Sequence, residues 1–404
     1  MKTKSKIPAL RFKGFTDAWE ERRLSEFVSF FNGLTYKPSD VREEGTLVLR
    51  SSNVKDGEII DADNVYVTSE MATSENVKRG DIIVVVRNGS RALIGKHATI
   101  KEDMPNTVIG AFMSGIRTGF PSFVNALLDT SQFNKEIEKN MGATINQITG
   151  YMFSQMNFLI PSASEQQQIG TFFAHLDTLI SLHQRKLDLL KEQKKGFLQK
   201  MFPKNGEKVP ELRFAGFADD WEERRLREVT IYQNGKGYED SQSSSGKFEL
   251  INLNSISIDG GLKSSEKYIE SADKTLLTDD LVMVLSDVGK GDLLGRVAII
   301  PKDNYYVLNQ RVALIRPKNK QQTNYLFSYI NSHQRYFKLH GAGMSQLNIS
   351  KGSVENFPLL LPSLPEQQQI GTFFAHLDTL ISLHQRKLDL LKELKKALLR
   401  QLFV

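Results

Sequence analysis

The clearest pattern of hydrophobic and polar positions is a long apolar stripe with helical spacing. Apolar residues recur every three or four positions, at Ile169, Phe172, Phe173, Leu176, Leu179, Ile180, Leu187 and Leu190. This spacing predicts an amphipathic helix. Ser164 and Gln167 fit a capping box at its start, and Phe202-Pro203 ends it, because proline cannot continue the hydrogen-bonded ladder.

The same stripe occurs twice in the chain. The letters EQQQIGTFFAHLDTLISLHQRKLDLLKE stand at residues 165–192 and again, unchanged, at 366–393. A second pair opens each half, PALRFKGFTDAWEERRL at 8–24 and PELRFAGFADDWEERRL at 210–226. The second helix is expected to begin near Pro365 and end near Phe403. The chain is therefore two copies of one unit.

Each helix, about 57 Å long at 1.5 Å per residue, needs a partner for its apolar face. The duplicate helix is the partner we expect, in antiparallel orientation; the alternative is that each helix packs only on its own domain. The residues predicted for helix pairing, which the family resemblance described below also implies for subunit docking, are Ile169, Phe173, Leu176, Ile180, Leu187, Ile370, Phe374, Leu377, Ile381 and Leu388.

Between the repeated blocks, the chain has short β-branched runs separated by Gly, Asn and Asp, followed by helical patterns. The predicted fold class is α/β (α+β), with two globular mixed α/β domains joined by two long helices that form an antiparallel coiled coil, in a pseudo-twofold internal repeat. The predicted segments are residues 1–160 and 204–361 for the domains, and 161–203 and 362–404 for the helices.

Composition narrows the classes of function. The chain has no cysteine, which excludes disulfides and thiol nucleophiles, and its formal net charge of +6 favours a polyanionic partner. The longest aliphatic stretch, Ile82 to Val86, is far too short to cross a bilayer, and no apolar signal segment opens the chain. We expect a soluble, cytoplasmic protein without a membrane partner.

No catalytic constellation is present in the sequence. Phosphate-binding loops, cofactor glycine fingerprints and the Asn-Pro-Pro-aromatic tetrapeptide of amino-methyltransferases do not occur. Asp279-Asp280 is interpreted as a strand-entry turn, with half of a nuclease site as the alternative. Packing on the helices is the interpretation of four histidines, with metal ligation as the alternative: His175, His183, His376 and His384. We therefore expect no catalytic residues, metal or cofactor.

The order of these blocks resembles a known family. A variable domain, then PSxxEQQQIG and a long helix, then the same series again, is similar to type I restriction-modification specificity (S) subunits over essentially the whole chain. Supporting matches are LRSSNVKDGEI at 49–59, the GD-I strand at 80–82 and LNQRVALIRP at 308–317. Residues 106–118 match the LNQ-type motif poorly.

The resemblance implies a non-catalytic subunit of a DNA adenine methyltransferase and restriction endonuclease complex. Each half would hold a target recognition domain that reads one half of a split site in double-stranded DNA. The helices would set the gap and dock two methyltransferase (M) subunits, with restriction (R) subunits joining through the M complex. S-adenosylmethionine and ATP would bind to those subunits, so this chain would need no cofactor.

Base reading needs forked or polar side chains at strand ends and loops. The predicted DNA-binding residues are Arg50, Ser52, Asn53, Arg87, Asn88, Arg91, Asn146 and Gln147 in the first domain, and Asn252, Asn254, Lys290, Asn309, Gln310, Arg311, Ser345, Gln346 and Lys351 in the second. The alternative for each is an ordinary solvated or turn-forming residue.

Two repeated features have competing interpretations. The LRFxGFxxxWEERRL block is interpreted as packing, with Trp19 and Trp221 buried where domain meets helix, and alternatively as a basic-aromatic nucleic-acid site. The lysines near the helix ends complement the helix dipole, with subunit docking or phosphate contact as the alternative. They are Lys191, Lys194 and Lys195 with their copies Lys392, Lys395 and Lys396.

Two functions of other classes stay open at this point. A self-contained DNA methyltransferase would bind S-adenosylmethionine by itself, and the missing catalytic tetrapeptide argues against it. A purely structural scaffold would be indifferent to DNA sequence, whereas two divergent domains on nearly identical frames suggest interchangeable readers.

Overall fold

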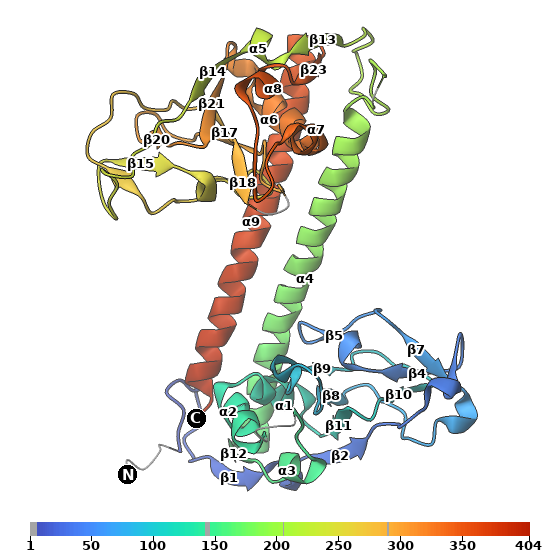
Figure 1. The fold of residues 1–404 in the computed structure, drawn as a ribbon. Coiled ribbons are helices and arrows are strands. Elements are labelled where there is room, and N and C mark those ends of the chain that lie inside the picture. Colours follow the sequence, from blue (N-terminus) through green and yellow to red (C-terminus); the bar gives the residue numbers. More distant parts are fainter. Residues whose placement is uncertain (1–5, 142–145, 205, 289–290) are drawn as a thin grey trace. The chain divides into compact units, whose positions relative to one another are not determined.

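The structure, a computed structural model, describes residues 6–141, 146–204, 206–288 and 291–404 (Figure 1). Contacts divide the chain into two compact units, Met1–Gln184 with Arg386–Val404, and Arg185–Gln385. Each unit therefore contains one globular domain together with parts of both long helices. We call them unit 1 and unit 2.

The main sheet of unit 1 is antiparallel, with strand order β2-β11-β8-β9. Its strands are Ser29–Asn32 (β2), Ile82–Val85 (β8), His97–Thr99 (β9) and Met113–Arg117 (β11). A second sheet has the order β10-β4-β7-β3, with strands Val41–Arg42 (β3), Thr46–Leu49 (β4), Val65–Val67 (β7) and Thr107–Ile109 (β10). The strand β8 is buried at every residue, because its sequence IIVV is wholly apolar.

Shorter elements complete this domain. The strands Glu20–Arg23 (β1) and Asn157–Ile160 (β12) pair antiparallel, as do Val54–Lys55 (β5) and Glu58–Ile59 (β6). The domain helices are Pro121–Leu128 (α1), Ser131–Asn140 (α2) and Gly150–Ser154 (α3). Single 3-10 turns are Leu24–Glu26 (η1), Pro38–Asp40 (η2), Ser51–Asn53 (η3), Ser69–Met71 (η4) and Arg91–Leu93 (η5).

Unit 2 repeats this plan. Its main sheet has the order β14-β21-β17-β19, with strands Thr230–Asn234 (β14), Leu281–Val284 (β17), Val297–Ile299 (β19) and Val312–Pro317 (β21). Its second sheet has the order β16-β15-β20, with strands Phe248–Ile251 (β15), Tyr268–Ile269 (β16) and Tyr306–Leu308 (β20). In both second sheets the pair β4–β10 or β15–β20 is parallel.

The remaining elements of unit 2 follow a similar but not identical order. Glu222–Arg225 (β13) pairs with Pro358–Leu361 (β23), and Ser286–Val288 (β18) pairs with Gln346–Asn348 (β22). Its helices are Leu226–Val229 (α5), Thr323–Ser332 (α6), Gln334–His340 (α7) and Lys351–Glu355 (α8), with 3-10 turns Leu253–Ser255 (η6) and Lys320–Gln322 (η7).

The two long helices are Ala163–Met201 (α4) and Leu364–Leu402 (α9), close to the predicted bounds. The predicted cap at Ser164 is wrong. Ser162 precedes the helix, and its Oγ accepts a hydrogen bond from the amide of Glu165 at 3.4 Å. The helix starts earlier than expected because the next serine upstream already satisfies a free amide of the first turn.

The repeated EQQQIG letters fasten each helix to its own domain. Arg11 donates two hydrogen bonds to the Glu165 carboxylate, both at 2.8 Å, and Arg213 does the same to Glu366 at 2.7 and 2.8 Å. Both glutamates are buried, so these forked ion pairs are shielded from water.

The glycine of the same motif permits a close approach between helices. A Cβ on Gly170 would lie 2.6 Å from the backbone nitrogen of Phe123 in α1, and one on Gly371 would lie 2.8 Å from that of Tyr325 in α6. Such distances are too short for real Cβ atoms. The motif therefore presses α4 against α1 and α9 against α6.

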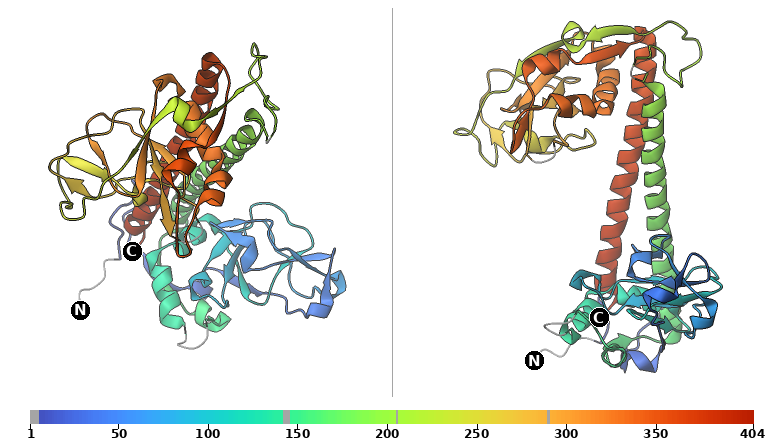
Figure 2. Two further views of the ribbon diagram at one scale, coloured as in Figure 1. Left: turned by 45° about the horizontal axis from the view of Figure 1, so that its top comes forward. Right: turned by 45° about the vertical axis from the view of Figure 1, so that its right-hand side comes forward.

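Within each unit, the beginning of one long helix lies against the end of the other (Figures 1 and 2). In unit 1, Lys395 of α9 forms an ion pair with Asp177 of α4, with 2.6 Å between Nζ and Oδ1. In unit 2, Lys194 of α4 bonds to Asp378 of α9 at 2.5 Å, and the Phe197 and Phe373 rings are 5.0 Å apart. The predicted antiparallel pairing is therefore confirmed within each unit, and the first turns of each helix pack on its own domain as well.

The last turn of each long helix packs in the core of the unit that contains it, which is not the unit in which the helix begins. Phe403 contacts Trp19, Phe123 and Phe173 in unit 1, with ring centroids 5.6 to 6.0 Å apart. Phe202 contacts the corresponding rings Trp221, Tyr325 and Phe374 in unit 2, at 5.8 to 6.5 Å. The packing interpretation of Trp19 and Trp221 is thereby confirmed, since both are buried against a helix end.

The mixed fold with two long helices agrees with the predicted fold class. The boundaries between the two compact units fall inside both long helices. The four segments predicted from the sequence end at residues 160, 203 and 361, and they stay a prediction. Among the described residues, none of the helices has the length and apolarity that a membrane crossing requires.

The close approach at Gly170 can be tested by substitution. Gly170→Ala should lower the midpoint of thermal unfolding, because the added methyl group must displace α1, at a cost of about 1–3 kcal/mol. Gly196→Ala is the matched control in the same helix. Nothing lies within 4 Å of the position that its added methyl group would take, and the repeat already has alanine there, at Ala397. Equal midpoints for the two variants would contradict the tight packing.

Candidate nucleic-acid interface

In unit 1, four loops meet beyond the end of β8. The backbone of Arg87 bridges to that of Gln147. The side-chain amide of Asn88 donates to Ser51 Oγ at 3.0 Å, and that of Asn146 donates to the carbonyl of Gly89 at 3.0 Å. The structure thus brings together four of the predicted residues, Arg87, Asn88, Asn146 and Gln147, with the loop that carries Ser52.

An exposed aromatic ring lies in the same place. The guanidinium of Arg87 sits 4.9 Å from the centre of the Phe112 ring, and Phe112 is 52% exposed. The amides of Val86 and Arg87 both donate to the Phe112 carbonyl, at 3.0 and 3.2 Å. The backbone therefore holds an apolar ring and a cation side by side at the surface.

Two predicted residues of unit 1 support a loop instead of facing solvent. Asn53 is fully buried, and its side-chain amide donates to the Ala62 carbonyl at 2.8 Å and to Asn64 at 2.9 Å. Arg50 forms an ion pair with Asp63 at 2.7 Å. Asn53 has no surface left for a base in this structure. Ser52 and Arg91 are exposed, Arg91 at the start of η5.

The corresponding place in unit 2 is occupied by Arg311. The amide of Leu285 donates to the Arg311 carbonyl at 2.9 Å, and the amide of Ile349 donates to the Leu285 carbonyl at 2.9 Å. In unit 1 the same two bonds run from Val86 to Phe112 and from Ile148 to Val86. Arg311 and Phe112 are therefore structural equivalents, although residues 106–118 hardly match the LNQ-type motif in sequence.

The neighbours of Arg311 differ in exposure. Gln310 and Arg311 are exposed, and Arg311 has a left-handed backbone with φ +65°. Asn309 is nearly buried, and its Oδ1 accepts the amide of Gln310 at 2.8 Å. This asparagine shapes the turn that presents the two exposed side chains.

The other predicted residues of unit 2 surround this turn or lie apart from it. Asn252 caps η6 by accepting the amide of Asn254, which is exposed. Ser345 is exposed, and the neighbouring Gln346 donates to Ser286 across β22 and β18. Lys351 lies 5.4 Å from the centre of the Tyr232 ring and 3.6 Å from a Glu355 carboxylate oxygen. Lys290 falls outside the described residues.

An aspartate at the entry of the central strand anchors each main sheet. Asp280 accepts two hydrogen bonds from Arg316, at 2.6 and 2.7 Å, and one from the amide of Leu277 at 2.8 Å. Hydrogen bonding to Asp280 raises the pKa of Arg316, so this guanidinium stays charged. Asp81 and Arg117 repeat the arrangement in unit 1. The strand-entry interpretation of Asp279-Asp280 is supported, since the Asp280 carboxylate is fully used.

The residues predicted for helix pairing and docking face mostly inward. Seven of them are buried: Ile169, Phe173, Leu176, Leu187, Ile370, Phe374 and Leu388. Ile180, Leu377 and Ile381 are half-buried. These side chains serve the cores and the helix pair, so they offer little surface to another subunit.

A second set of leucines on the same helices was not among the residues predicted for docking, although Leu179 stood in the predicted apolar stripe. These side chains are 44% to 69% exposed: Leu179, Leu182, Leu189, Leu380, Leu383, Leu390 and Leu394. Leu179, Leu182 and Leu189 recur as Leu380, Leu383 and Leu390 in the duplicated block, so the repeat itself carried the signal. Large exposed apolar side chains can mark a surface that another protein covers.

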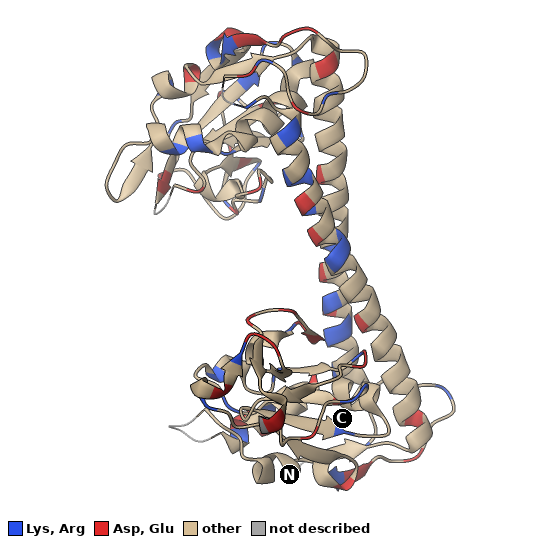
Figure 3. Cartoon of the chain, turned by 90° about the vertical axis from the view of Figure 1, so that its right-hand side faces the viewer, with Lys and Arg blue, Asp and Glu red and all other residues tan. Residues whose placement is uncertain are grey.

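Metal binding finds no support among the described residues, where no cluster of three His, Asp or Glu side chains could hold an ion. His175 and His376 are exposed on their helices. Figure 3 shows basic and acidic positions interleaved along the long helices.

Comparisons with known proteins agree with the internal repeat. A family model described as "Type I restriction modification DNA specificity domain" matches residues 16–192 and 218–393. The type I restriction enzyme StySPI specificity subunit of Salmonella potsdam is 23% identical over 96% of this chain and 89% of its own. The MjaVIII specificity subunit of Methanocaldococcus jannaschii is 24% identical over 95% of this chain and 92% of its own.

A solved structure has the same fold. The S subunit of a type I restriction-modification system from M. genitalium matches with a TM-score of 0.70 at 14% identity, over 98% of this chain and 99% of its own. At that identity the likeness concerns the fold alone.

Proposed function

The chain belongs to the type I restriction modification DNA specificity family, whose domain it carries twice, and we propose from this membership that it is the DNA-recognition subunit of a cytoplasmic type I restriction-modification complex. Its relatives are specificity subunits, which makes the chain a recognition component and leaves catalysis to other subunits. Methylation with S-adenosylmethionine, and ATP-driven cleavage, would then belong to the M and R subunits.

The observation that carries the proposal is that the two units have different side chains at equivalent backbone positions. The carbonyls of Phe112 and Arg311 accept equivalent backbone hydrogen bonds, from Val86 just after β8 and from Leu285 just after β17, yet one side chain is an apolar ring and the other a forked cation. Arginine suits the acceptor edge of guanine in the major groove, and an apolar ring suits the thymine methyl group. Each unit would therefore read its own half of a bipartite site.

The DNA contacts that we propose are exposed or half-buried side chains of the two units. They are Ser52, Arg87, Asn88, Arg91, Phe112, Asn146 and Gln147 in unit 1, and Asn254, Gln310, Arg311, Ser345, Gln346 and Lys351 in unit 2. Arg50, Asn53, Asn252 and Asn309 would act by shaping the loops. In unit 1, hydrogen bonds from Asn88 to Ser51 and from Asn146 to Gly89 hold two of these side chains in place before DNA binds, which reduces the entropy cost of recognition.

The long helices would have two further roles. Each is one continuous helix of 39 residues, and a continuous helix is stiff enough to set the gap between two half-sites. The exposed leucines would contact the M subunits, since their burial would remove apolar surface from water. Two M subunits suit the repeat, because leucines at equivalent positions recur in both copies, and R subunits would join through the M complex.

Base reading by Arg311 can be measured on the assembled complex with its M subunits. Arg311→Ala should weaken binding to the cognate site by about 1–3 kcal/mol and relax the preference at one base pair of the second half-site. The comparison is made over duplexes that vary one base pair at a time. Arg335→Ala, which removes an exposed arginine of α7, should leave both affinity and preference unchanged. Loss of affinity without any change in base preference would contradict base reading by Arg311.

Docking of the M subunit on the exposed leucines predicts that their substitution weakens assembly without destabilising the chain. Leu179→Gln with Leu182→Gln should abolish co-purification of the M subunit while the thermal unfolding midpoint of the chain stays the same, because both side chains are already exposed. Leu176→Gln is the comparison variant; it should lower the midpoint, since Leu176 is buried in the unit 1 core. Retention of M by the double variant would refute docking at this surface.

A further inference from the structure

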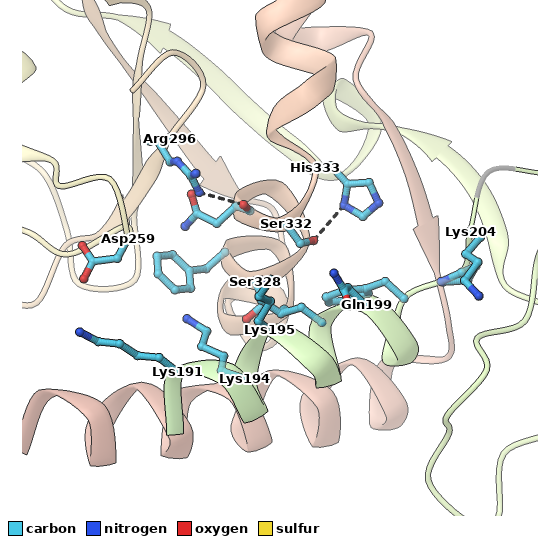
Figure 4. Close-up of a pocket in the computed structure, with 15 residues that line it drawn as sticks. Lys191, Lys194, Lys195, Gln199, Lys204, Asp259, Arg296, Ser328, Ser332 and His333 are labelled. Carbon is cyan, nitrogen blue, oxygen red and sulfur yellow. Dashed lines mark hydrogen bonds between the residues drawn. The ribbon is translucent and has the colours of Figure 1, made fainter. Parts of the chain in front are cut away.

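Unit 2 contains a basic pocket beside the last turns of α4. Its cavity volume is about 770 Å³, and it opens between α4, α6 and the loop that leads into β19 (Figure 4). Five cations line it, Lys191, Lys194, Lys195, Lys204 and Arg296, against the single carboxylate of Asp259. Apolar surface comes from Leu198, Phe202, Pro203 and Phe327.

Two of the five cations, Arg296 and Lys191, form no ion pair within the part of the chain that the structure describes. Arg296 donates to the backbone carbonyls of Asn331 at 2.9 Å and Asp292 at 3.5 Å. In the portion of the chain that the structure describes, no carboxylate lies within 4.0 Å of the charged nitrogens of Arg296 or Lys191. Burial lowers the pKa of Arg296, and the charges of Asp259 and Asp292 act in the opposite direction.

The other three lysines are partly compensated. Lys194 bonds to Asp378 at 2.5 Å, Lys204 lies 3.3 Å from Glu211, and Lys195 lies 4.0 Å from Glu192. Both Lys195 and Lys204 remain well exposed at the pocket rim. The pocket therefore keeps an excess of positive charge that solvent can reach.

Unit 1 provides an internal comparison, because the same helix letters face a different domain there. Lys395, the copy of Lys194, is held by two carboxylates, Asp129 and Asp177, each at 2.6 Å. Phe123 and Tyr325 occupy equivalent places against Gly170 and Gly371, so Asn331 stands in α6 where Asp129 follows α1. Unit 2 has thus replaced an acidic partner with a neutral amide.

We propose that this basic pocket of unit 2 binds phosphate groups, supplied by the DNA backbone flanking the half-site that unit 2 reads. The inference rests on the proposed function. Lysine is a compact point charge with rotatable donors, which suits phosphate contact without base recognition. Free nucleotide polyphosphate carries the same chemistry, and the experiment separates the two sources.

The test uses the complex of the full chain with its M subunits. Lys191→Gln with Lys195→Gln should make the plot of log binding constant against log salt concentration shallower, by about 0.9 for each phosphate that the chain no longer neutralises. The methylated motif should not change. Lys392→Gln with Lys396→Gln is the matched control at the copied positions, and its slope should equal that of the wild type.

The outcomes are distinguishable. Equal slopes for wild type and both variants, or equal changes in both variants, would overturn the phosphate pocket. Inorganic triphosphate is titrated into the complex without DNA as a second arm: binding that the Lys191 and Lys195 changes abolish, with an unaltered salt slope, would overturn DNA as the source. A wild-type complex that binds no DNA would instead refute the proposed function itself.

Discussion

Each hydrophobic core is closed by an aromatic ring from the far end of a helix that begins in the other unit. Phe403 fills the space between Trp19 and Phe173, and Phe202 fills the corresponding space between Trp221 and Phe374. A buried Phe contributes about 1.5–3 kcal/mol, so neither core is complete without the last turn of a long helix. Each long helix therefore contributes its first turns to one core and its last turn to the other.

The repeated sequence attaches each long helix to the domain of its own half. Glu165 and Glu366 bind an arginine from the opening block of their own half, and Gly170 and Gly371 admit a domain helix at close range. None of these contacts involves the loops beyond β8 and β17. A frame held in this way leaves those loops free to differ, and they do differ, with Phe112 in one unit and Arg311 in the other. Stability and recognition are thus assigned to separate parts of the chain.

The sequence predicted the helices, their pairing and the mixed domains well, because a long apolar stripe and an unchanged repeat are strong periodic signals. The individual residues proposed to contact DNA were harder to predict from the sequence. Asn53 and Ser52 are neighbours of similar polarity, and only tertiary contacts with Ala62 and Asn64 bury the first and leave the second exposed. The equivalence of Phe112 and Arg311 was hidden for the same reason, since backbone hydrogen bonds define the position and the side chains share nothing.

The central claim is that each unit reads its half-site independently on a common frame. Its most direct test is a map of methylated adenines in cells that carry the M subunit and a chimera in which residues 27–160 come from another specificity subunit. The account predicts a new base sequence in one half of the methylated motif, with the other half and the gap unchanged, because α4 and α9 are untouched. A change in both halves, or in the gap, would contradict it.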